Sequence, residues 1–221
     1  MLKLTEWMTG VRPRERPRTE PPVENLMSSP LFTRLTEQLA AAGRCSLLDL
    51  GPARGANVSF FGQQHCKLQI ADCAEGLLDL NARALTEPTA LAEALEQEVP
   101  LSAEEPCDAV LAWDLFNYLD KPLLKALMLH LAPVVTGDTW LHAYIGARRE
   151  MPALPAQYRL TREGQLSVRP NTGELRRCPC YTQPDLHGLM PQFQVARSTL
   201  LQNGVQEYLF RGQGRRHRTA R

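Results

Sequence analysis

Short apolar runs alternate with helical patterns along most of this chain, and that alternation restricts the fold more than any other feature. The runs at 45–51, 107–113 and 139–145 are too short for helices and are rich in apolar residues, which is typical of buried strands. Between them, apolar residues recur at helical spacing over 30–42 and 121–131. Strands that alternate with helices indicate a parallel sheet covered on both faces. We therefore predict an α/β fold with a doubly wound, mostly parallel sheet.

The C-terminal part departs from this alternation. Asn203-Gly204 separates two strand-like runs at 193–201 and 205–210. Asn-Gly is a strong signal for a two-residue hairpin turn, because both turn positions need a positive φ. The sheet is therefore expected to end in a C-terminal antiparallel hairpin.

Proline content and charge divide the chain into segments. Residues 1–28 form a Pro- and Arg-rich N-terminal arm that we expect to be mobile. Residues 29–211 form one domain, and residues 212–221 form a basic tail that we expect to be frayed. Within the domain, a polar insertion at 150–180 is expected to lie over the carboxyl edge of the sheet and to contain a small hairpin at 158–168.

The near-neutral total charge conceals an uneven distribution. The sequence has 25 Lys and Arg against 24 Asp and Glu, a net charge of +1, which argues against a uniformly basic nucleic-acid-binding surface. Residues 1–18 carry +3 and residues 211–221 carry +5, which leaves −7 for the segment between them. Two interpretations of the basic ends stay open. They are solvated segments that aid solubility, or they contact a nucleic-acid backbone or an acidic protein partner.

The six cysteines are expected to be reduced thiols, because the 221-residue chain shows no signal peptide pattern. Cys178-Pro-Cys180 is spaced too closely for a usual zinc pair, and no second pair follows, so no metal site is expected. The sequence also has no apolar run long enough to span a membrane. Together these observations favour a cytoplasmic protein.

Four motifs follow one another in a fixed order along the domain. They are the turn Leu47-Leu-Asp-Leu-Gly51-Pro-Ala-Arg-Gly55-Ala-Asn57, Asp72 at the end of the next strand, the segment Asp108-Ala-Val-Leu-Ala-Trp-Asp114-Leu-Phe-Asn-Tyr118, and the closing hairpin. In this order they resemble a class I S-adenosylmethionine-dependent methyltransferase, over Ser29 to Arg211. The resemblance implies S-adenosylmethionine as the cofactor and methyl transfer as the activity.

The resemblance also implies a role for seven residues. Asp49 and Gly51 would touch the methionine part of the cofactor, Gly55 would shape the turn, Asp72 would bind the ribose, and Asp114, Leu115 and Asn117 would border the sulfonium. Other roles stay open: Asp49 as the cap of the next helix, Asp72 as an exposed turn acid, Asp114 as a loop cap, and Trp113 as a core residue. Candidate general bases are Asp114, Tyr118 and His142, and no motif distinguishes among them.

Two departures from the family pattern affect the functional prediction. Ala53 stands where the family has its middle glycine, and Pro52 stiffens the turn and removes an amide donor. The family's third strand is not visible, because residues 91–100 are helical and acidic in pattern. Two functions therefore compete. The first is methyl transfer to an unidentified acceptor, and the second is a non-catalytic, methyltransferase-like interaction module with weak or lost cofactor binding.

Overall fold

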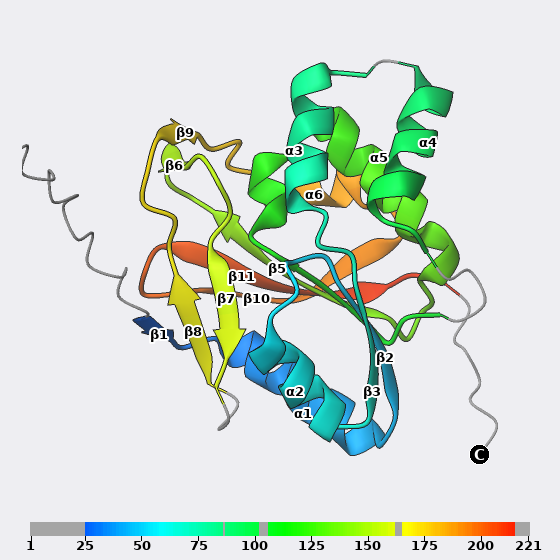
Figure 1. Ribbon diagram of the computed structural model, residues 1–221, viewed down its shortest axis with the longest axis vertical. Coiled ribbons are helices and arrows are strands. Elements are labelled where there is room, and N and C mark those ends of the chain that lie inside the picture. The colour runs from blue at the N-terminus through cyan, green and yellow to red at the C-terminus, as the bar shows by residue number, and fades with distance from the viewer. Residues whose placement is uncertain (1–24, 86, 102–105, 162–164, 215–221) are drawn as a thin grey trace, which may run out of the picture.

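The computed structural model describes residues 25–85, 87–101, 106–161 and 165–214, and a central sheet organises them (Figure 1). In this part of the chain the sheet has six strands in the order β10-β11-β5-β4-β2-β3. Their bounds are β2 (Cys45–Asp49), β3 (Cys66–Ile70), β4 (Ala109–Trp113), β5 (Trp140–Gly146), β10 (Phe193–Leu200) and β11 (Val205–Gly212). Strands β2 to β5 are parallel, and β11 is antiparallel to both of its neighbours. The predicted sheet and its C-terminal hairpin are confirmed.

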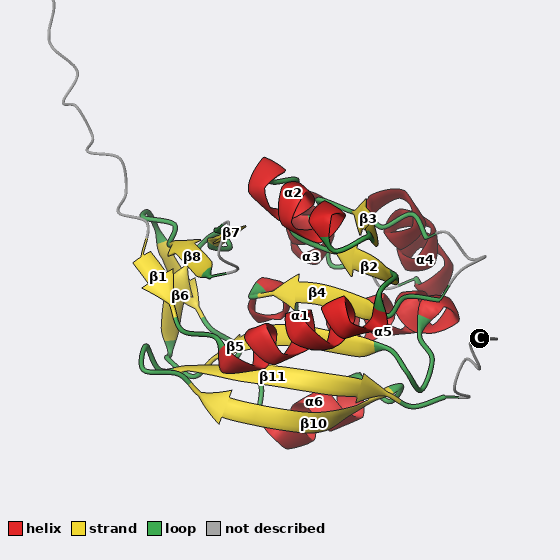
Figure 2. Cartoon of the chain, turned by 90° about the horizontal axis from the view of Figure 1, so that it is seen from below, coloured by secondary structure: helices red, strands yellow, loops and turns green. Residues whose placement is uncertain are grey.

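Helices cover both faces of this sheet. One face carries α1 (Pro30–Ala42) and α2 (Gly55–Gln63), and the other carries α3 (Ala74–Arg83), α4 (Pro88–Glu98), α5 (Lys121–Leu131) and α6 (Gln183–Leu189). Figure 2 shows α1 lying along β5 and β11. Successive strand residues point to opposite faces, so Leu47 is buried on the α1 side and Leu48 on the α5 side. No helix in the described ranges combines the length and apolar character needed to cross a membrane.

Two of the later helices begin with the caps that their sequences predict. The carboxylate of Asp120 accepts a hydrogen bond from the backbone N–H of Leu123 at 2.8 Å, at the start of α5. Thr182 and Asp185 form a reciprocal capping box at the start of α6. Helix α1 differs, because its Ser29 hydroxyl caps no backbone group of the helix.

The carboxylate of Glu207, on β11, accepts the hydrogen bonds at the start of α1. Glu207 is fully buried and accepts hydrogen bonds from the backbone N–H groups of Leu31 (3.2 Å) and Phe32 (2.8 Å). Ser29 Oγ donates to the same carboxylate at 2.5 Å, and His142 Nε2 lies 2.9 Å from it. Burial alone would raise the pKa of Glu207, but the hydrogen bonds from His142, Ser29 and Phe32 hold it below its ordinary value. This carboxylate therefore joins the first helix to the middle of the sheet.

The insertion forms two small sheets. Strand β7 (Gln157–Leu160) pairs with β8 (Leu166–Arg169), and β6 (Glu150–Pro152) pairs with β9 (Leu175–Arg177). The predicted hairpin at 158–168 is confirmed, although its turn at 162–164 lies outside the described residues. The predicted boundary of the N-terminal arm is wrong, because Asn25–Met27 forms β1 and pairs with β8. Residues 1–24 lie outside the described part.

The C-terminal boundary also shifts. Gly212 N–H donates to Thr139 O at 2.8 Å and Gln213 N–H donates to Gln192 O at 2.7 Å, so the ordered chain continues past residue 211. Arg211 belongs to the domain, since its guanidinium donates to Asp138 at 2.6 Å and covers the Trp140 ring. The rest of the predicted basic end, at 215–221, lies outside the described residues, as does the other basic end at 1–18.

In the described part of the chain, no third strand joins the sheet beyond β3. Helices α3 and α4 occupy the connection from β3 to β4, as the sequence predicts for residues 91–98. The segment after α4 returns past β3, where the side-chain amide of Gln69 donates to Pro100 O at 2.5 Å. Residues 102–105 are not described. Strand β3 is therefore an edge strand of the sheet.

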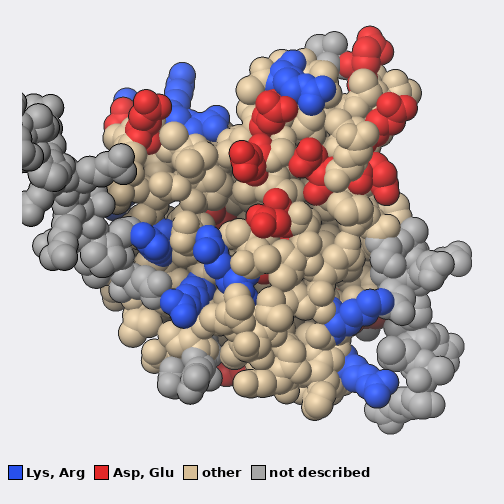
Figure 3. Space-filling model, in the orientation of Figure 1, with Lys and Arg blue, Asp and Glu red and all other residues tan. Residues whose placement is uncertain are grey.

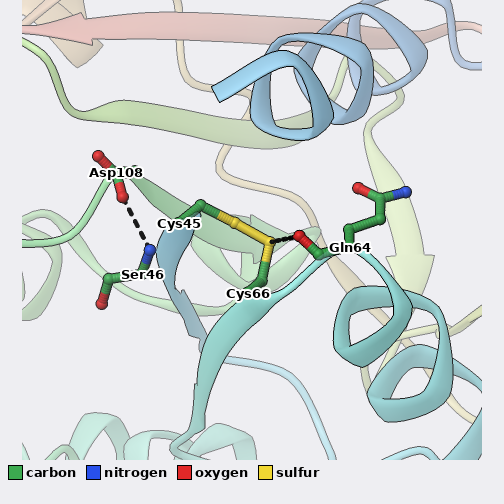
Figure 4. The surroundings of a disulfide bond; sticks show 5 residues. All are labelled: Cys45, Ser46, Gln64, Cys66 and Asp108. Atoms are coloured by element: carbon green, nitrogen blue, oxygen red, sulfur yellow. Dashed lines mark hydrogen bonds between the residues drawn. A yellow bond between two sulfur atoms is a disulfide. The ribbon is translucent and has the colours of Figure 1, made fainter. Parts of the chain in front are cut away.

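The prediction that all six cysteines are reduced is wrong for one pair. Cys45 and Cys66 form a disulfide, and their Cα atoms are 4.5 Å apart (Figure 4). They are directly paired residues at the amino ends of the parallel strands β2 and β3. Sequence spacing alone does not reveal this, because the pairing depends on the register of the two strands. Cys73, Cys107, Cys178 and Cys180 are free thiols.

Replacing Glu207 should destabilise the fold. In Glu207→Gln, the amide NH2 adds a donor where the carboxylate accepts hydrogen bonds from Ser29 and the start of α1, and we expect a loss of about 3 kcal/mol in the free energy of unfolding. Urea unfolding at pH 7 measures this loss, with Glu37→Gln at an exposed position of α1 as control. The depressed pKa makes this contribution present at neutral pH and lost as pH falls through the folded-state pKa, so the two proteins should converge in acid. Equal stability at pH 7 would contradict the role given to Glu207.

Candidate functional site

Three aspartates follow the carboxyl ends of three neighbouring parallel strands. Asp49 ends β2, Asp72 comes two residues after β3, and Asp114 follows β4 directly. Strand order reverses between β2 and β4, since β3 lies outward on one side and β5 on the other. In open parallel sheets, ligands bind beyond the carboxyl ends at such a reversal. The three predicted acids therefore lie together at the carboxyl ends of the strands.

Asp49 is buried and already holds two donors. Its Oδ1 accepts the backbone N–H of Gly51 at 2.9 Å and the indole Nε1–H of Trp113 at 2.6 Å. Burial raises the pKa of Asp49 to about 6, the two hydrogen bonds oppose this shift, and the charge of Asp72 adds to it. The alternative that Asp49 caps the next helix is wrong, because Arg54 occupies the N-cap of α2 and no side chain caps it.

Trp113 fills the space in front of Gly51. Its ring is 4% exposed and stacks on Tyr158 at a centroid distance of 5.0 Å, and Tyr158 stacks on Tyr144 at 5.2 Å. We call these three residues the aromatic stack. A Cβ on Gly51 would lie 2.7 Å from two indole atoms, so only glycine fits under this ring. Trp113 also has φ +50°, a strained value for a residue of its size.

Little space remains between the three strand ends. A cavity of about 20 Å³, the inner cavity, is bordered by Gly51, Trp113, Asp114, Ala156 and Tyr158. It has room for about one water molecule. The acids fit the chemistry that the resemblance implies, since carboxylates bind ammonium and ribose hydroxyl groups. The space does not fit S-adenosylmethionine in this conformation, because the aromatic stack occupies it.

Asp114 borders a second and larger space. Its Oδ2 accepts the backbone N–H of Ala156 at 3.0 Å, and the hydroxyl of Tyr158 donates to the same carboxylate. Burial raises the pKa of Asp114 to about 7, and the hydrogen bonds from Ala156, from its own backbone and from Tyr158 only partly offset this shift. A cavity of about 310 Å³, the outer cavity, lies on its far side. Asp114, Ala156 and Tyr158 border both cavities.

The other two candidate bases, His142 and Tyr118, are not placed to act as a general base at the strand ends. His142 is fully buried on the α1 face of the sheet, where it pairs with Glu207. Tyr118 donates its hydroxyl to Leu154 O at 2.9 Å, and burial raises its pKa far above neutrality. Asp114 is therefore the only one of the three predicted candidates that combines a position at the strand ends with a pKa near 7.

The remaining predicted cofactor residues have different surroundings. Leu115 is buried and borders the inner cavity. Asn117 joins the turn after β4 to β5, because its amide donates to Asp114 O and Tyr144 O, both at 2.9 Å, and its Oδ1 accepts from Gly146 N–H. Gly55 begins α2 and borders neither cavity.

Asp72 is exposed and lies on a turn with φ +48°. Its ribose-binding role stays a prediction. The predicted position of the insertion over the carboxyl edge is confirmed, since Ala156 and Tyr158 complete the wall there. Their individual contacts were not predictable, because no local signal in the sequence assigns insertion residues to particular strand ends.

The chain was compared with known families, curated proteins and solved structures. Neither a protein-family model nor a curated protein matches the chain. Similar solved structures include a SAM-dependent methyltransferase from Methanosarcina mazei (11% identity, 86% of this chain and 100% of that chain, TM-score 0.49). Another is a TehB-like SAM-dependent methyltransferase from Corynebacterium glutamicum (12% identity, 82% of this chain and 87% of that chain, TM-score 0.47). A third is the N-methyltransferase NodS from Bradyrhizobium japonicum (14% identity, 83% of this chain and 94% of that chain, TM-score 0.44). At this identity and TM-score the likeness carries no argument about activity.

The strand order itself defines the fold class. Four parallel strands with a reversal between β2 and β4, followed by an antiparallel strand inserted beside β5, form a class I methyltransferase-like sheet that lacks its third strand in the described part. Among the described residues, no group of three or more His, Cys, Asp or Glu side chains is arranged to hold a metal ion.

The contact between Gly51 and Trp113 can be tested with a matched pair of glycine substitutions. Gly51→Ala should lower the free energy of unfolding by about 1–3 kcal/mol, because the new methyl group meets the indole ring. Gly55→Ala should leave stability unchanged or slightly higher, since a Cβ there meets no atom within 4 Å. Urea unfolding followed by circular dichroism measures both. Equal effects of the two substitutions would contradict the packing described for Trp113.

The raised pKa of Asp114 predicts a dependence of stability on pH. The folded protein binds this proton more tightly than the unfolded chain, so the contribution is full below about pH 4 and is lost as pH rises through about 7. Relative to Asp114→Asn, the wild-type protein should lose roughly 2 kcal/mol of unfolding free energy between pH 5 and pH 8. The exposed Asp79→Asn is the control. Parallel pH profiles for wild type and Asp114→Asn would be the contrary result.

Proposed function

We propose that this chain is an S-adenosylmethionine-dependent methyltransferase whose resting conformation fills the cofactor site with its own side chains. The observation that carries the proposal is the convergence of Asp49, Asp72 and Asp114 at the reversal in strand order. The cofactor would supply a methyl group on a sulfonium, which is already activated for displacement. The ammonium, ribose and sulfonium parts of the cofactor would then correspond to Asp49, Asp72 and Asp114.

Opening of the site requires movement of two rings. Trp113 Nε1–H already donates to Asp49, the acid assigned to the ammonium group. Tyr158 closes the same space from the insertion side. In the proposal, the indole is the internal substitute for the ammonium group, and ligand entry displaces it. We assign no reaction step to the closed conformation.

Asp114 is the proposed base for removing a proton from the acceptor. Its carboxylate lies between the inner and outer cavities, and its pKa near 7 matches proton transfer at neutral pH. The acceptor would occupy the outer cavity.

A second candidate function is supported by the filled inner cavity. In that alternative, the fold is an interaction module that binds no cofactor. The aromatic stack is then permanent core packing, and the Trp113–Asp49 hydrogen bond replaces the lost ligand. The two functions differ in one measurable property, which is affinity for S-adenosylmethionine.

Titration calorimetry with S-adenosylmethionine and S-adenosylhomocysteine separates the two functions. For the methyltransferase, wild type should bind, Trp113→Ala should bind at least tenfold more tightly because less protein must move, and Asp72→Ala should bind at least tenfold more weakly. Trp140→Ala is the matched control, since Trp140 borders neither cavity. Absence of heat with both wild type and Trp113→Ala at 1 mM ligand would favour the interaction module.

Trp113→Ala removes a large buried ring, so its folding must be established separately. Trp113→Phe removes the indole donor to Asp49 but keeps an aromatic ring, so it leaves a much smaller void than alanine. If the alanine variant melts early, the phenylalanine variant provides the same comparison, with a smaller expected gain in affinity. Circular dichroism melting of each variant accompanies the titrations.

A further inference from the structure

The outer cavity has a composition that indicates what it binds. It lies between the carboxyl end of β5 and the insertion, and its walls include Asp114, Tyr118, Tyr144, Tyr158, Arg148 and Cys178. At about 310 Å³ it is large enough for a small organic molecule but smaller than most sites for drug-sized ligands.

The three tyrosines are almost fully buried, and they contribute ring edges rather than hydroxyl groups to the wall of this cavity. The Tyr118 hydroxyl donates to Leu154 O at 2.9 Å, the Tyr144 hydroxyl is 2.6 Å from Ser29 Oγ, and the Tyr158 hydroxyl donates to Asp114. Because the protein already uses all three hydroxyls, and Tyr144 and Tyr158 stack face to face, a ligand meets mainly ring edges. Such walls suit a flat, partly apolar molecule.

The insertion beside this cavity is rich in arginine. The described part of 146–180 contains six arginines and two glutamates. Residues 72–98, around α3 and α4, contain seven acids and one arginine. Figure 3 shows this division, with the acidic side chains gathered over α3 and α4 and basic side chains on the side of the insertion. An anionic ligand is therefore attracted toward the outer cavity and repelled from the helical side.

Two of these arginines are placed to hold an anion. Arg148 lines the cavity, and its guanidinium is anchored by a hydrogen bond of 3.1 Å from Nη2 to Asn203 O. Arg176 does not itself line the cavity, but its guanidinium carbon lies 5.7 Å from the centre of the ring of Tyr118, which does. Glu150 also lines the cavity, but it is directly opposite Arg177 in the β6–β9 pair, which offsets its charge.

We infer that the outer cavity binds a small planar molecule that carries an anionic group. Its flat part lies between the edges of the tyrosine rings, its anion is held by Arg148 and Arg176, and its opposite end reaches Asp114. The binding claim stands on the cavity itself. Only the identification of this molecule as the methyl acceptor rests on the proposed function.

A pair of probes that differ only in charge tests the inference. Titration calorimetry of wild-type protein, without S-adenosylmethionine, compares 4-aminobenzoate with the neutral 4-aminobenzamide. The anion should bind about tenfold more tightly, and the difference should shrink with added salt. Adenosine monophosphate and adenosine form a second pair that distinguishes a nucleotide source of the same chemistry from an aromatic carboxylate.

Substitutions of the two arginines test whether the probes bind in the outer cavity. Arg148→Gln and Arg176→Gln should each weaken binding of the preferred anion about tenfold and leave the neutral probe unchanged. Arg197→Gln, at an exposed position on β10, is the matched control and should have no effect. Circular dichroism shows whether each variant is folded.

Three outcomes would overturn the inference: no binding of any of the four probes at 5 mM, equal affinity for charged and neutral partners, or anion binding that survives both arginine substitutions. Each is separable from the cofactor question. The probes are titrated without cofactor, and the cofactor titrations of wild type and the Trp113 variants use no probe.

Discussion

The hydrogen bond from the Trp113 indole to Asp49 is the interaction on which the state of the whole site depends. It satisfies a buried carboxylate at 2.6 Å and fixes the indole over Gly51. The fixed indole then supports Tyr158, whose hydroxyl holds Asp114. Removing this one donor would leave a buried acid short of a partner and the aromatic stack without its anchor. The inner cavity is small because these contacts support one another.

Three buried or half-buried carboxylates in this domain show how donors decide the direction of a pKa shift. Glu207 has four donors or ring partners around it, and its pKa lies below the ordinary value. Asp49 has two donors and Asp114 has three, and their pKa values rise to about 6 and about 7. Burial acts in the same direction on all three. The acid that stabilises the fold is therefore the one with the most donors, and the acids at the strand ends keep their protons more readily.

Local patterns in the sequence predict most of the sheet but little of the site's contacts. The strand runs, the Asn203-Gly204 hairpin and the cap at Asp120 follow from neighbouring residues, so they can be predicted from them. Ser29 shows the limit, because a carboxylate 178 positions away, rather than its own hydroxyl, holds the start of α1.

The same limit explains the other misses. The Cys45–Cys66 pair depends on strand register, and the filling of the inner cavity depends on an insertion that returns to the sheet from about forty residues beyond Trp113. The positions of Asp49, Asp72 and Asp114 were predictable, because strand ends can be identified from apolar runs. Their partners were not, because those partners come from distant segments.

The disulfide has a consequence for how this site can open. It closes a covalent macrocycle through residues 45–66, which contains Asp49, Gly51 and all of α2. Because β2, which lies within this ring, is also paired with β3 along its whole length, the wall that carries Asp49 is held at both its covalent and its hydrogen-bonded contacts. Trp113 and Tyr158 lie outside the ring, on segments with no such covalent closure in the described part of the chain. An opening motion is therefore expected at the end of β4 and in the insertion, opposite a wall that a covalent bond ties together.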